Sequence, residues 1–311
     1  MKTLLDTKNA FEAGSIAKPD FIRGMYEEHH AKLFDYADYL SHVNIAAIEI
    51  AEGRVTMTSR REGIKIVCPK GDYRVAPIEI LNFTDYEIVD SNMILRLVGA
   101  DDCVLDVGAN MGWYSILIAK TRPGAAVHAF EPLPNTYTVL QENVALNGIK
   151  NVVLHPFGFS SEKKDLRFFF LPEGSGNASS VNLTGRSDAQ EIVCHVDVMD
   201  EAISDLGIRR VDFIKCDVEG AELFVFQGGL KTIARDKPVV FSEMLRKWSE
   251  KFNYHPNQII DLFRDLGYRC YTAEGERLRE FFVMDINTVE TNFFFLHGEK
   301  HAAAIAALLV K

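Results

Sequence analysis

The sequence predicts an α/β protein built on a doubly wound, mostly parallel β-sheet, and three observations carry this prediction. From Asp101 onward, short apolar runs alternate with segments of helical length, which is typical of parallel βαβ units. A glycine-containing turn follows the first apolar run, where a parallel strand would pass into its helix. Gly148 and Gly267 stand where two helical segments end, as glycines commonly do at helix C-termini.

The remaining elements follow from the same periodicities. Residues 1 to about 50 have apolar positions at helical spacing, and short strands are predicted at 54–58, 64–68 and 73–75. The repeating part is predicted to have strands at 103–107, 126–130, 151–157, 211–216 and 239–242, and helices at 113–120, 134–147, from 220 onward, and at 256–266. Residues 281–284 and 292–296 predict an antiparallel hairpin at one sheet edge, and the Gly/Ser/Asn-rich stretch 174–180 predicts a loop.

This change of pattern divides the chain into an N-terminal extension, residues 1–80, and a main domain, residues 81–311. The extension contains helical and short-strand patterns but no motif of known function. A lid, a dimerisation segment and a substrate-selecting cap are open alternatives for it. A homodimer formed through this extension is one expectation.

Composition narrows the expected partners and compartment. A net charge of −10 disfavours a nucleic-acid partner, because affinity for a phosphate backbone depends on clustered Lys and Arg. Five widely spaced cysteines without a CxxC pair indicate a reducing compartment. The sequence shows neither a signal-peptide pattern nor a run of 18 apolar residues, so we expect a cytoplasmic protein without a membrane partner.

The strongest functional signal is the turn Asp106-Val-Gly108-Ala-Asn110-Met-Gly112. Ligands of open α/β sheets bind at the carboxyl ends of strands, where a glycine lets the backbone approach the ligand closely. A nicotinamide-dinucleotide fingerprint would need glycines at positions 106, 108 and 111, and only Gly108 is present. The acidic Asp106 suits a cationic ligand such as S-adenosylmethionine, which carries an ammonium and a sulfonium group.

A second signal is Glu131, at the end of the next predicted strand. A carboxylate at that place can accept hydrogen bonds from both hydroxyls of a ribose. This feature alone is shared with NAD enzymes, but together with the Asp106 turn it favours S-adenosylmethionine. The alternative is a strand-end carboxylate that faces solvent.

Three segments of the chain together resemble the FkbM family of S-adenosylmethionine-dependent methyltransferases: VLDVGANMGWYS, FEPLPNTYTVLQENVALNG and VDFIKCDVEGAE. The stretches 177–180 and 198–201 also fit the family's pattern, and the resemblance covers about residues 101–296. Cys216 departs from the small aliphatic residue that the family usually has between Lys215 and Asp217.

The resemblance implies a Rossmann-like fold of the class I methyltransferase type, S-adenosylmethionine as the cofactor and, in most members, methylation of oxygen. It also implies the residues that contact the cofactor. These are Asp106, Gly108, Asn110 and Gly112 for the methionine portion, Glu131, Pro132 and Asn135 for the ribose, Phe157, Gly158 and Ser160 for the adenine, Asp217 beside the transferable methyl, and Glu87 as a further contact.

Candidate catalytic residues follow the later parallel strands. Asp217 is a candidate general base, since an aliphatic hydroxyl is a poor nucleophile until a base takes its proton. Glu219 and Glu243 are candidates to bind the acceptor or a divalent cation, and His195 is a further candidate base, although a strand histidine is more often packed. The alternative for Asp217 and Glu219 is to bond N–H groups at the start of the next helix. Hard cations need more oxygen ligands than these three residues offer, so no metal is expected.

These observations predict an S-adenosylmethionine-dependent methyltransferase that acts on a hydroxyl or carboxylate oxygen of a small metabolite, sugar or natural product. The alternatives are N-methylation of a peptide or small molecule, an NAD-dependent oxidoreductase, and a cofactor-binding module without catalytic activity.

Overall fold

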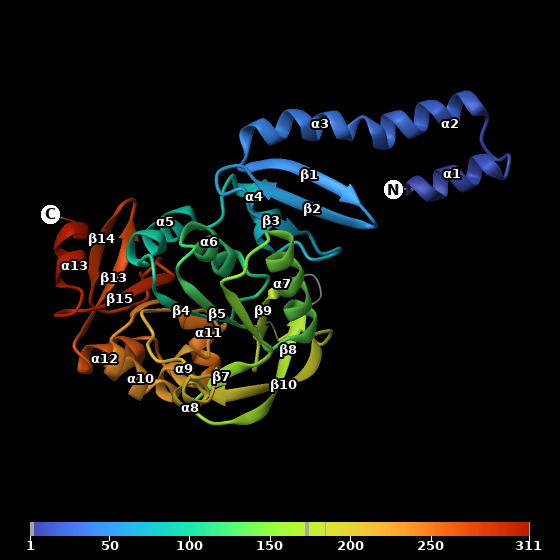
Figure 1. Ribbon diagram of the computed structural model, residues 1–311. Helices are drawn as coiled ribbons and strands as arrows, with labels where there is room; N and C mark the ends of the chain where they lie inside the picture. Colours follow the sequence, from blue (N-terminus) through green and yellow to red (C-terminus); the bar gives the residue numbers. More distant parts are fainter. Residues whose placement is uncertain (1–2, 172–173, 184, 311) are drawn as a thin grey trace.

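An eight-stranded β-sheet, in the order β14-β13-β15-β12-β11-β4-β5-β6, is the centre of the protein (Figure 1). The computed structural model describes residues 3–171, 174–183 and 185–310. The strands of this sheet are β4 (Cys103–Val107), β5 (Ala126–Phe130), β6 (Val152–His155), β11 (Phe213–Cys216), β12 (Val239–Glu243), β13 (Tyr268–Glu274), β14 (Arg277–Phe281) and β15 (Asn292–His297). From β6 to β12 all neighbours are parallel, whereas β15 is antiparallel to both β12 and β13.

The strand order reverses between β4 and β11. From β4 the chain continues outward to β5 and β6, and it later returns to β11 on the other side of β4. A crevice at the carboxyl ends of the strands forms at such a reversal, and ligands of open α/β sheets bind there. The predicted doubly wound, Rossmann-like sheet is confirmed.

Helices cover both faces of the large sheet and enclose two apolar cores. One core contains residues of α4 (Ala76–Phe83), α5 (Ile88–Leu97), α6 (Trp113–Thr121), α7 (Pro134–Leu146) and α13 (Ala302–Leu308). The other contains residues of α8 (Met199–Asp205), α9 (Glu222–Gly228), α10 (Leu230–Asp236) and α12 (Asn257–Asp265), while α11 (Arg246–Ser249) and the 3₁₀ turn η3 (Glu250–Phe252) follow β12. Successive strand residues alternate between the cores, as Val239 and Val240 do, because side chains of a strand point to opposite faces.

A smaller sheet, in the order β7-β10-β8-β9, lies beside the carboxyl edge of the large one. Its strands are β7 (Gly158–Ser160), β8 (Lys164–Leu171), β9 (Gly174–Ser179) and β10 (Gln190–Val198). Ser179 of β9 is buried, and its hydroxyl donates a hydrogen bond of 2.8 Å to the carbonyl of Glu219 in the turn after β11. The small sheet is therefore joined to the turn that carries the candidate catalytic carboxylates.

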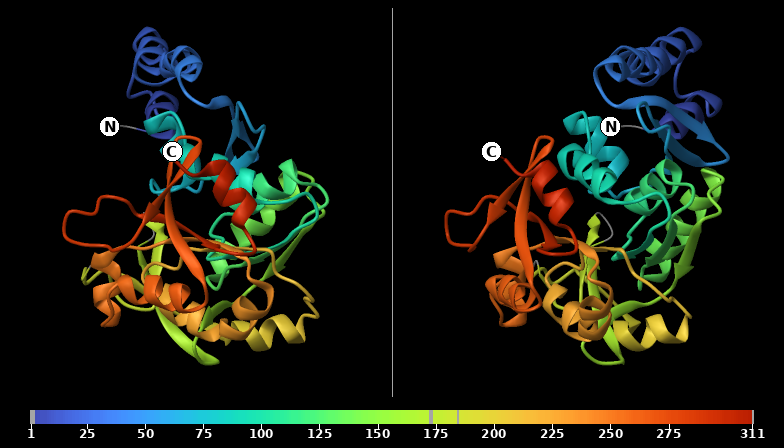
Figure 2. Two further views of the ribbon diagram at one scale, coloured as in Figure 1. Left: turned by 90° about the vertical axis from the view of Figure 1, so that its left-hand side faces the viewer. Right: turned by 60° about the vertical axis from the view of Figure 1, so that its left-hand side comes forward.

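The N-terminal region has two parts with different packing. Its helices are α1 (Leu4–Glu12), α2 (Lys18–Met25), the π-helical turn η1 (Tyr26–His30), α3 (Lys32–Tyr39) and the 3₁₀ turn η2 (Leu40–His42), and they project from the body as an arm (Figures 1 and 2). The strands β1 (Ile45–Ala51), β2 (Arg54–Ser59) and β3 (Lys65–Val67) form an antiparallel sheet. Residues of this sheet belong to the same apolar core as β4 and α6, so the sheet is part of the body.

Two N-terminal predictions were wrong. Residues 45–51 form strand β1 rather than helix, because Glu52 and Gly53 both have positive φ, the geometry of a tight hairpin turn that pairs β1 with β2. Residues 73–75 form no strand, since Val75 is instead the N-cap residue of α4.

Two further predictions also need correction. The C-terminal hairpin consists of β13 and β14, which turn at Gly275. The prediction paired β14 with β15 because it lacked β13, which lies between them in the sheet. Residues 174–179 form strand β9, which pairs with β8, rather than a loop. Among the residues that the structure describes, no helix combines the length and apolarity needed to span a membrane.

Candidate active site

The site begins at the turn between β4 and α6, beside the reversal in strand order. Gly108 follows β4 and has a φ of +74°, a backbone conformation that residues other than glycine rarely adopt. A Cβ atom on Gly108 would lie 1.9 Å from the carbonyl oxygen of Asp217, in the turn after β11. Glycine is required here because the two strand-end turns touch.

Three adjoining cavities lie along this edge of the sheet, and we refer to them together as the cleft. The first, of about 420 Å³, lies against the small sheet; the second, of about 60 Å³, lies over the glycine turn; and the third, of about 280 Å³, is lined by acidic residues. Neighbouring cavities share lining residues: Pro132, Phe168 and Val218 join the first to the second, and Asn110, Asp217 and Glu219 join the second to the third.

Glu131 lines the second cavity, and the backbone holds its carboxylate in place. Its Oε2 accepts a hydrogen bond from the N–H of Asn110 at 3.0 Å, and its Oε1 accepts one from the N–H of Leu133 at 2.9 Å. Each carboxylate oxygen can accept two hydrogen bonds, so both oxygens keep one acceptor position for a pair of ligand hydroxyls. Burial raises the pKa of Glu131 to about 7, although the two backbone hydrogen bonds oppose this rise.

A buried ion pair between Lys215 and Asp106 lies beneath the cleft. The two residues are register neighbours in β11 and β4, and Lys215 Nζ lies 3.3 Å from Asp106 Oδ1 and 3.7 Å from Asp217 Oδ2. The same ammonium donates a hydrogen bond of 2.6 Å to the carbonyl of Gly108. Burial lowers the pKa of Lys215, but the charges of Asp106 and Asp217 outweigh burial and hold that pKa above its ordinary value. Lys215 therefore links the glycine turn to Asp217 through a positive charge.

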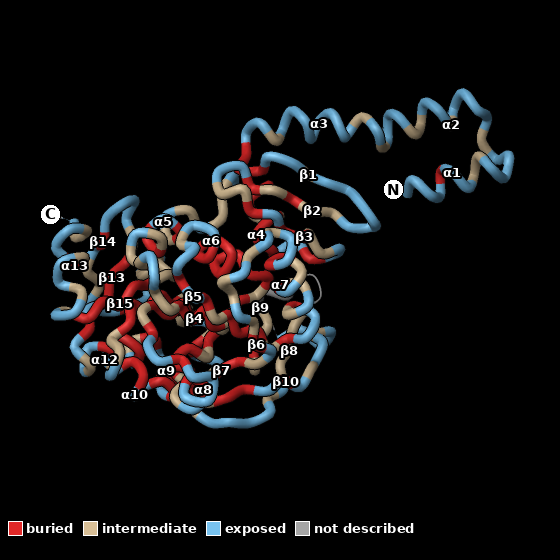
Figure 3. The backbone as a smooth tube through the Cα atoms, in the orientation of Figure 1, coloured by how far each residue is buried: buried red, intermediate tan, exposed pale blue. Residues whose placement is uncertain are grey.

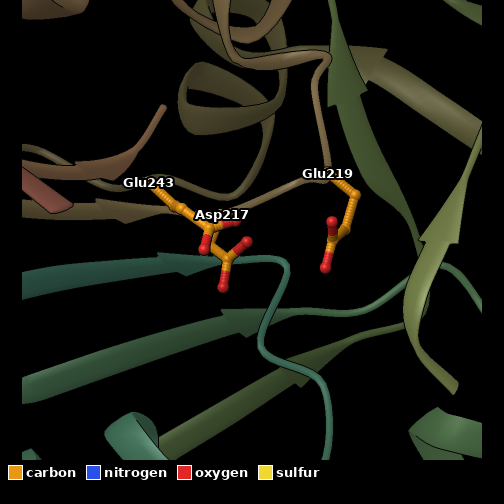
Figure 4. A group of neighbouring side chains, drawn as sticks. All are labelled: Asp217, Glu219 and Glu243. Carbon is orange, nitrogen blue, oxygen red and sulfur yellow. The ribbon is translucent and has the colours of Figure 1, made fainter. Parts of the chain in front are cut away.

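Three carboxylates gather at the third cavity: Asp217, Glu219 and Glu243 (Figure 4). Each offers an oxygen within 4.8 Å of the others. Glu219 has a φ of +55°, which is uncommon for a residue with a side chain, and its side chain lies near those of Asp217 and Glu243 (Figure 4). Burial, and then the charge of Asp217, raise the pKa of Glu219 and of Glu243 well above their ordinary values. The third cavity is therefore suited to a cationic ligand or to proton acceptance.

Glu87 is a further carboxylate of the same cavity, which Glu79 and Asp85 also line, and Tyr114 holds Glu87 in place. The hydroxyl of Tyr114, in α6, donates a hydrogen bond to Glu87 Oε2. Burial raises the pKa of Glu87 to about 6, while the hydrogen bond from Tyr114 lowers it. Arg74 and Tyr86 line the cavity as well.

Glu222 has a structural position instead. Its Oε1 accepts hydrogen bonds from the N–H groups of Val218 and Gly220 at 3.1 and 3.0 Å, and its Oε2 lies 3.2 Å from the hydroxyl of Tyr254. Glu222 therefore holds the turn that carries Asp217 and Glu219, and neither of those two carboxylates bonds the helix start in its place.

Most predicted cofactor and catalytic residues line this cleft. They are Glu87, Gly108, Asn110, Glu131, Pro132, Gly158, Ser160, Asp217, Glu219 and Glu243. Asn135 lines a separate pocket of about 260 Å³ that adjoins the second cavity and shares Asn110, Leu133 and Thr136 with it.

Asp106 and Gly112 do not line these cavities. Asp106 is fully buried: its Oδ2 accepts a hydrogen bond of 2.5 Å from Ser115 Oγ, and its Oδ1 faces Lys215. Asp106 therefore lies beneath the cleft and does not line it. A Cβ atom on Gly112 would lie 2.5 Å from Leu140 Cδ1, so this glycine permits α6 to pack on α7.

Phe157 and His195 also lie outside the cleft cavities. Phe157 packs against Phe130, and the next residues along the chain line the first cavity. Val196 points into that cavity, so its neighbour His195 points to the opposite face of β10, where its Nδ1 lies 2.9 Å from Asp165 Oδ1. His195 is therefore not grouped with the three carboxylates.

The sequence prediction missed Lys215 beneath the cleft, and Arg74 and Thr136 in its lining. A usable signal existed for Lys215, because a charged residue stands inside the apolar run VDFIKC of a buried strand, where it needs a partner. Arg74 and Thr136 had no such signal, since they reach the cleft from segments that only the folded chain brings together.

Comparison with known proteins relates the chain to methyltransferases. Residues 106–270 match the family described as Methyltransferase FkbM domain. Methyltransferase sdnD of Sordaria araneosa is 33% identical over 179 residues, which cover 45% of this chain and 69% of that protein. The 2-O-methyltransferase NoeI of Sinorhizobium fredii is 27% identical over 164 residues, covering 48% of this chain and 66% of that protein.

A solved structure, methyltransferase FkbM from Methylobacillus flagellatus, has 18% sequence identity and a TM-score of 0.41, covering 66% of this chain and 47% of that one. The match of residues 106–270 extends over more than half of the chain and contains the glycine turn, Glu131 and the carboxylate-bearing turn after β11. The chain belongs to the FkbM family of methyltransferases, and its cofactor is S-adenosylmethionine.

Proposed function

We propose that this protein transfers the methyl group of S-adenosylmethionine to an oxygen atom of a small molecule, with Asp217 as the general base. The observation that carries this proposal is the position of Asp217. It follows β11 at the reversal in strand order, and it lines both the cavity of Glu131 and the acidic cavity of Glu243.

The residues of the cleft fit the cofactor. Asn110 Oδ1 and Glu219 Oε2 are buried and have no hydrogen-bond partner among the described residues, so polar positions remain for a ligand. Glu131 keeps two acceptor positions for ribose hydroxyls, the first cavity has the volume for a purine, and the acidic third cavity suits an ammonium and a sulfonium. When bound, the cofactor supplies an electrophilic methyl group.

Within this proposal the chain's own residues have separate tasks. Glu131 and Asn110 bind the cofactor, and Lys215 orients Asp217. Asp217 accepts the proton of the acceptor hydroxyl as the hydroxyl oxygen becomes a nucleophile. Glu219 and Glu243 lie near enough to share that proton. Catalysis otherwise depends on positioning and on exclusion of water.

The pocket of about 260 Å³ that adjoins the second cavity is the place we propose for the body of the acceptor. Its lining comes from four parts of the chain: Pro69 and Lys70 before α4, Met111 in the glycine turn, residues 133–139 at the start of α7, and Phe170 and Ile192 in the small sheet. This mixture of apolar walls and a few polar groups is typical of small-molecule sites. The relative NoeI is named a 2-O-methyltransferase, which supports oxygen as the methylated atom.

Replacing Asp217 with Asn tests the proposal. We expect calorimetric affinity for S-adenosylhomocysteine to change less than about threefold, and methyl transfer to a hydroxylated acceptor to fall by about 100-fold or more, since general-base catalysis contributes that much. Asp165→Asn, at an exposed position outside the cleft, is the control and is expected to keep both properties. Unchanged turnover in Asp217→Asn would exclude Asp217 as the base. Transfer to amines but not to hydroxyls would show that nitrogen is the methylated atom. Binding of NAD without the adenosyl ligands would overturn the proposal as a whole.

A further inference from the structure

The arm, residues 3–42, is hardly packed on the rest of the chain. Of its helical residues only Thr7 is buried, and the tube of α1, α2 and α3 is almost entirely exposed (Figure 3). Its attachment lies at one end, where the hydroxyl of Tyr39 donates to the carbonyl of Leu81 and Arg60 Nη2 donates to the carbonyl of Leu40 at 2.9 Å.

Large apolar side chains of the arm are nevertheless exposed to solvent. Leu33 and Phe34 of α3 are 59% and 62% exposed, and Ile22 of α2 is 57% exposed. The full set is Leu4, Leu5, Ile22, Tyr26, Leu33, Phe34, Tyr36 and Tyr39. Exposed apolar side chains in this number along one arm mark it as an interaction surface, since single proteins seldom leave large apolar patches uncovered.

The arm also lacks the packing that its helices require. Residues 18–42 are helical almost throughout, as α2, η1, α3 and η2, yet none of these helical residues is buried. Helices in proteins gain most of their stability by burying an apolar face. Within the arm, the rings of Phe11 and Phe21 stack at 4.3 Å between centroids, which fixes α1 against α2 but covers little of α3. The described residues therefore leave α2 and α3 without a covering surface.

We infer that a second copy of this chain covers the arm, through contact of α2 and α3 with their counterparts. Six of the large apolar side chains lie on residues 18–42, and at roughly 100 Å² each they present on the order of 600 Å² of apolar surface. Two copies would then bury about 1,200 Å² together, which is the lower end of the range for stable interfaces. A two-fold contact brings each apolar surface against an identical one, so the arm is complementary to itself.

The charges of the arm disfavour two other classes of partner. Residues 3–42 contain four Lys or Arg and seven Asp or Glu, a balance that opposes nucleic acid and anionic membrane surfaces. Some of these charges pair within the arm, as Asp20 does with Arg23 at 2.8 Å and Lys8 with Glu12 at 3.8 Å. The excess of acidic residues also opposes contact between two arms, so association of two copies rests on the apolar side chains.

Sedimentation equilibrium of the full chain and of the double variant Leu33→Glu, Phe34→Glu tests the inference. We expect the wild type to have twice the mass of one chain at micromolar concentration, and the variant to dissociate at least 100-fold more readily. The control is Ile286→Glu, Val289→Glu, which changes two exposed apolar residues between β14 and β15, outside the arm, and is expected to remain dimeric.

Hydrogen exchange at two protein concentrations provides a second measurement that does not depend on a variant. Amides of residues 18–40 are expected to be protected more strongly at the higher concentration, because that condition favours the dimer. A wild type with the mass of one chain, or a dimer that survives in Leu33→Glu, Phe34→Glu with unchanged protection of residues 18–40, would overturn the inference. Both variants are expected to bind S-adenosylhomocysteine like the wild type, so failure of this inference is separate from failure of the proposed function.

Discussion

Glu222 shapes the turn on which Asp217 and Glu219 stand. It is almost completely buried, and its carboxylate accepts hydrogen bonds from two backbone N–H groups of that turn. Burial raises its pKa from 4.5 to about 7, although the backbone hydrogen bonds lower it. The native protein therefore keeps this proton over a pH range in which the unfolded chain has lost it.

Replacing Glu222 with Gln is expected to remove a pH-dependent loss of stability. Because the folded-state pKa is raised, protonated Glu222 contributes fully to the stability of the wild type below pH 4.5. This contribution is lost as pH rises through about 7. The difference between wild type and Glu222→Gln should then change by about 3 kcal/mol in favour of the variant from about pH 4 to about pH 8. Urea unfolding at the two pH values measures it, with the exposed Glu250→Gln as the control. An equal difference at both pH values would contradict the assignment.

At the scale of elements, one buried side chain connects three segments around the cleft. Asn143 of α7 accepts a hydrogen bond of 2.8 Å from the N–H of Val67 at the end of β3, and it donates one of 2.8 Å to the carbonyl of Met111 in the glycine turn. The N-terminal sheet, α7 and the glycine turn are therefore held in one arrangement. A shift of the glycine turn relative to α7 would change the shape of the cleft.

Replacing Asn143 with Ala is expected to lower the free energy of unfolding by about 3 kcal/mol, because two buried backbone groups lose their partners. Affinity for S-adenosylhomocysteine is expected to fall by about tenfold, since the glycine turn loses a support. Denaturant unfolding and calorimetry measure the two effects. Gln141→Ala, at an exposed position of the same helix, is the control, and equal losses in both variants would show that Asn143 has no special role.

At the scale of the whole molecule, the N-terminal sheet and the large sheet share one apolar core. Ile45, Met57 and Ile66 of the N-terminal sheet belong to the same buried cluster as Val104 of β4 and Ile116 of α6. The predicted division at residue 80 falls within α4, whose Ile80 is fully buried in that cluster.

Two truncations are expected to behave differently. A chain that begins at residue 43 loses only the arm and is expected to keep cooperative thermal unfolding and cofactor binding. A chain that begins at residue 81 loses β1 to β3 and most of α4, exposes the core, and is expected to unfold without a cooperative transition. Circular dichroism on heating compares them, and cooperative unfolding of residues 81–311 would instead support the predicted main domain as an independent unit.

The local pattern of the sequence was sufficient for the parallel strands and for much of the cleft. Apolar runs, glycine turns and strand-end carboxylates are short-range features, so Gly108, Glu131 and Asp217 could be located from a few neighbouring residues. The carboxyl ends of parallel strands share one edge, and this rule alone brought Asp217 and Glu243 together. The antiparallel strands were less predictable, because whether β15 pairs with β14 or with β13 depends on contacts far apart in the sequence.

Only the tertiary structure decided which side chains face the cleft. Asp106 and His195 looked suited to ligand binding by residue type, yet β4 buries the first beside Lys215 and β10 turns the second to its outer face. Burial and the direction of a strand residue depend on what packs on each face, and that information is not local. The sequence by itself therefore determined the family, the cofactor and the strand-end motifs. Packing across the sheets decided which residues line the cleft, and it left the arm exposed (Figure 3).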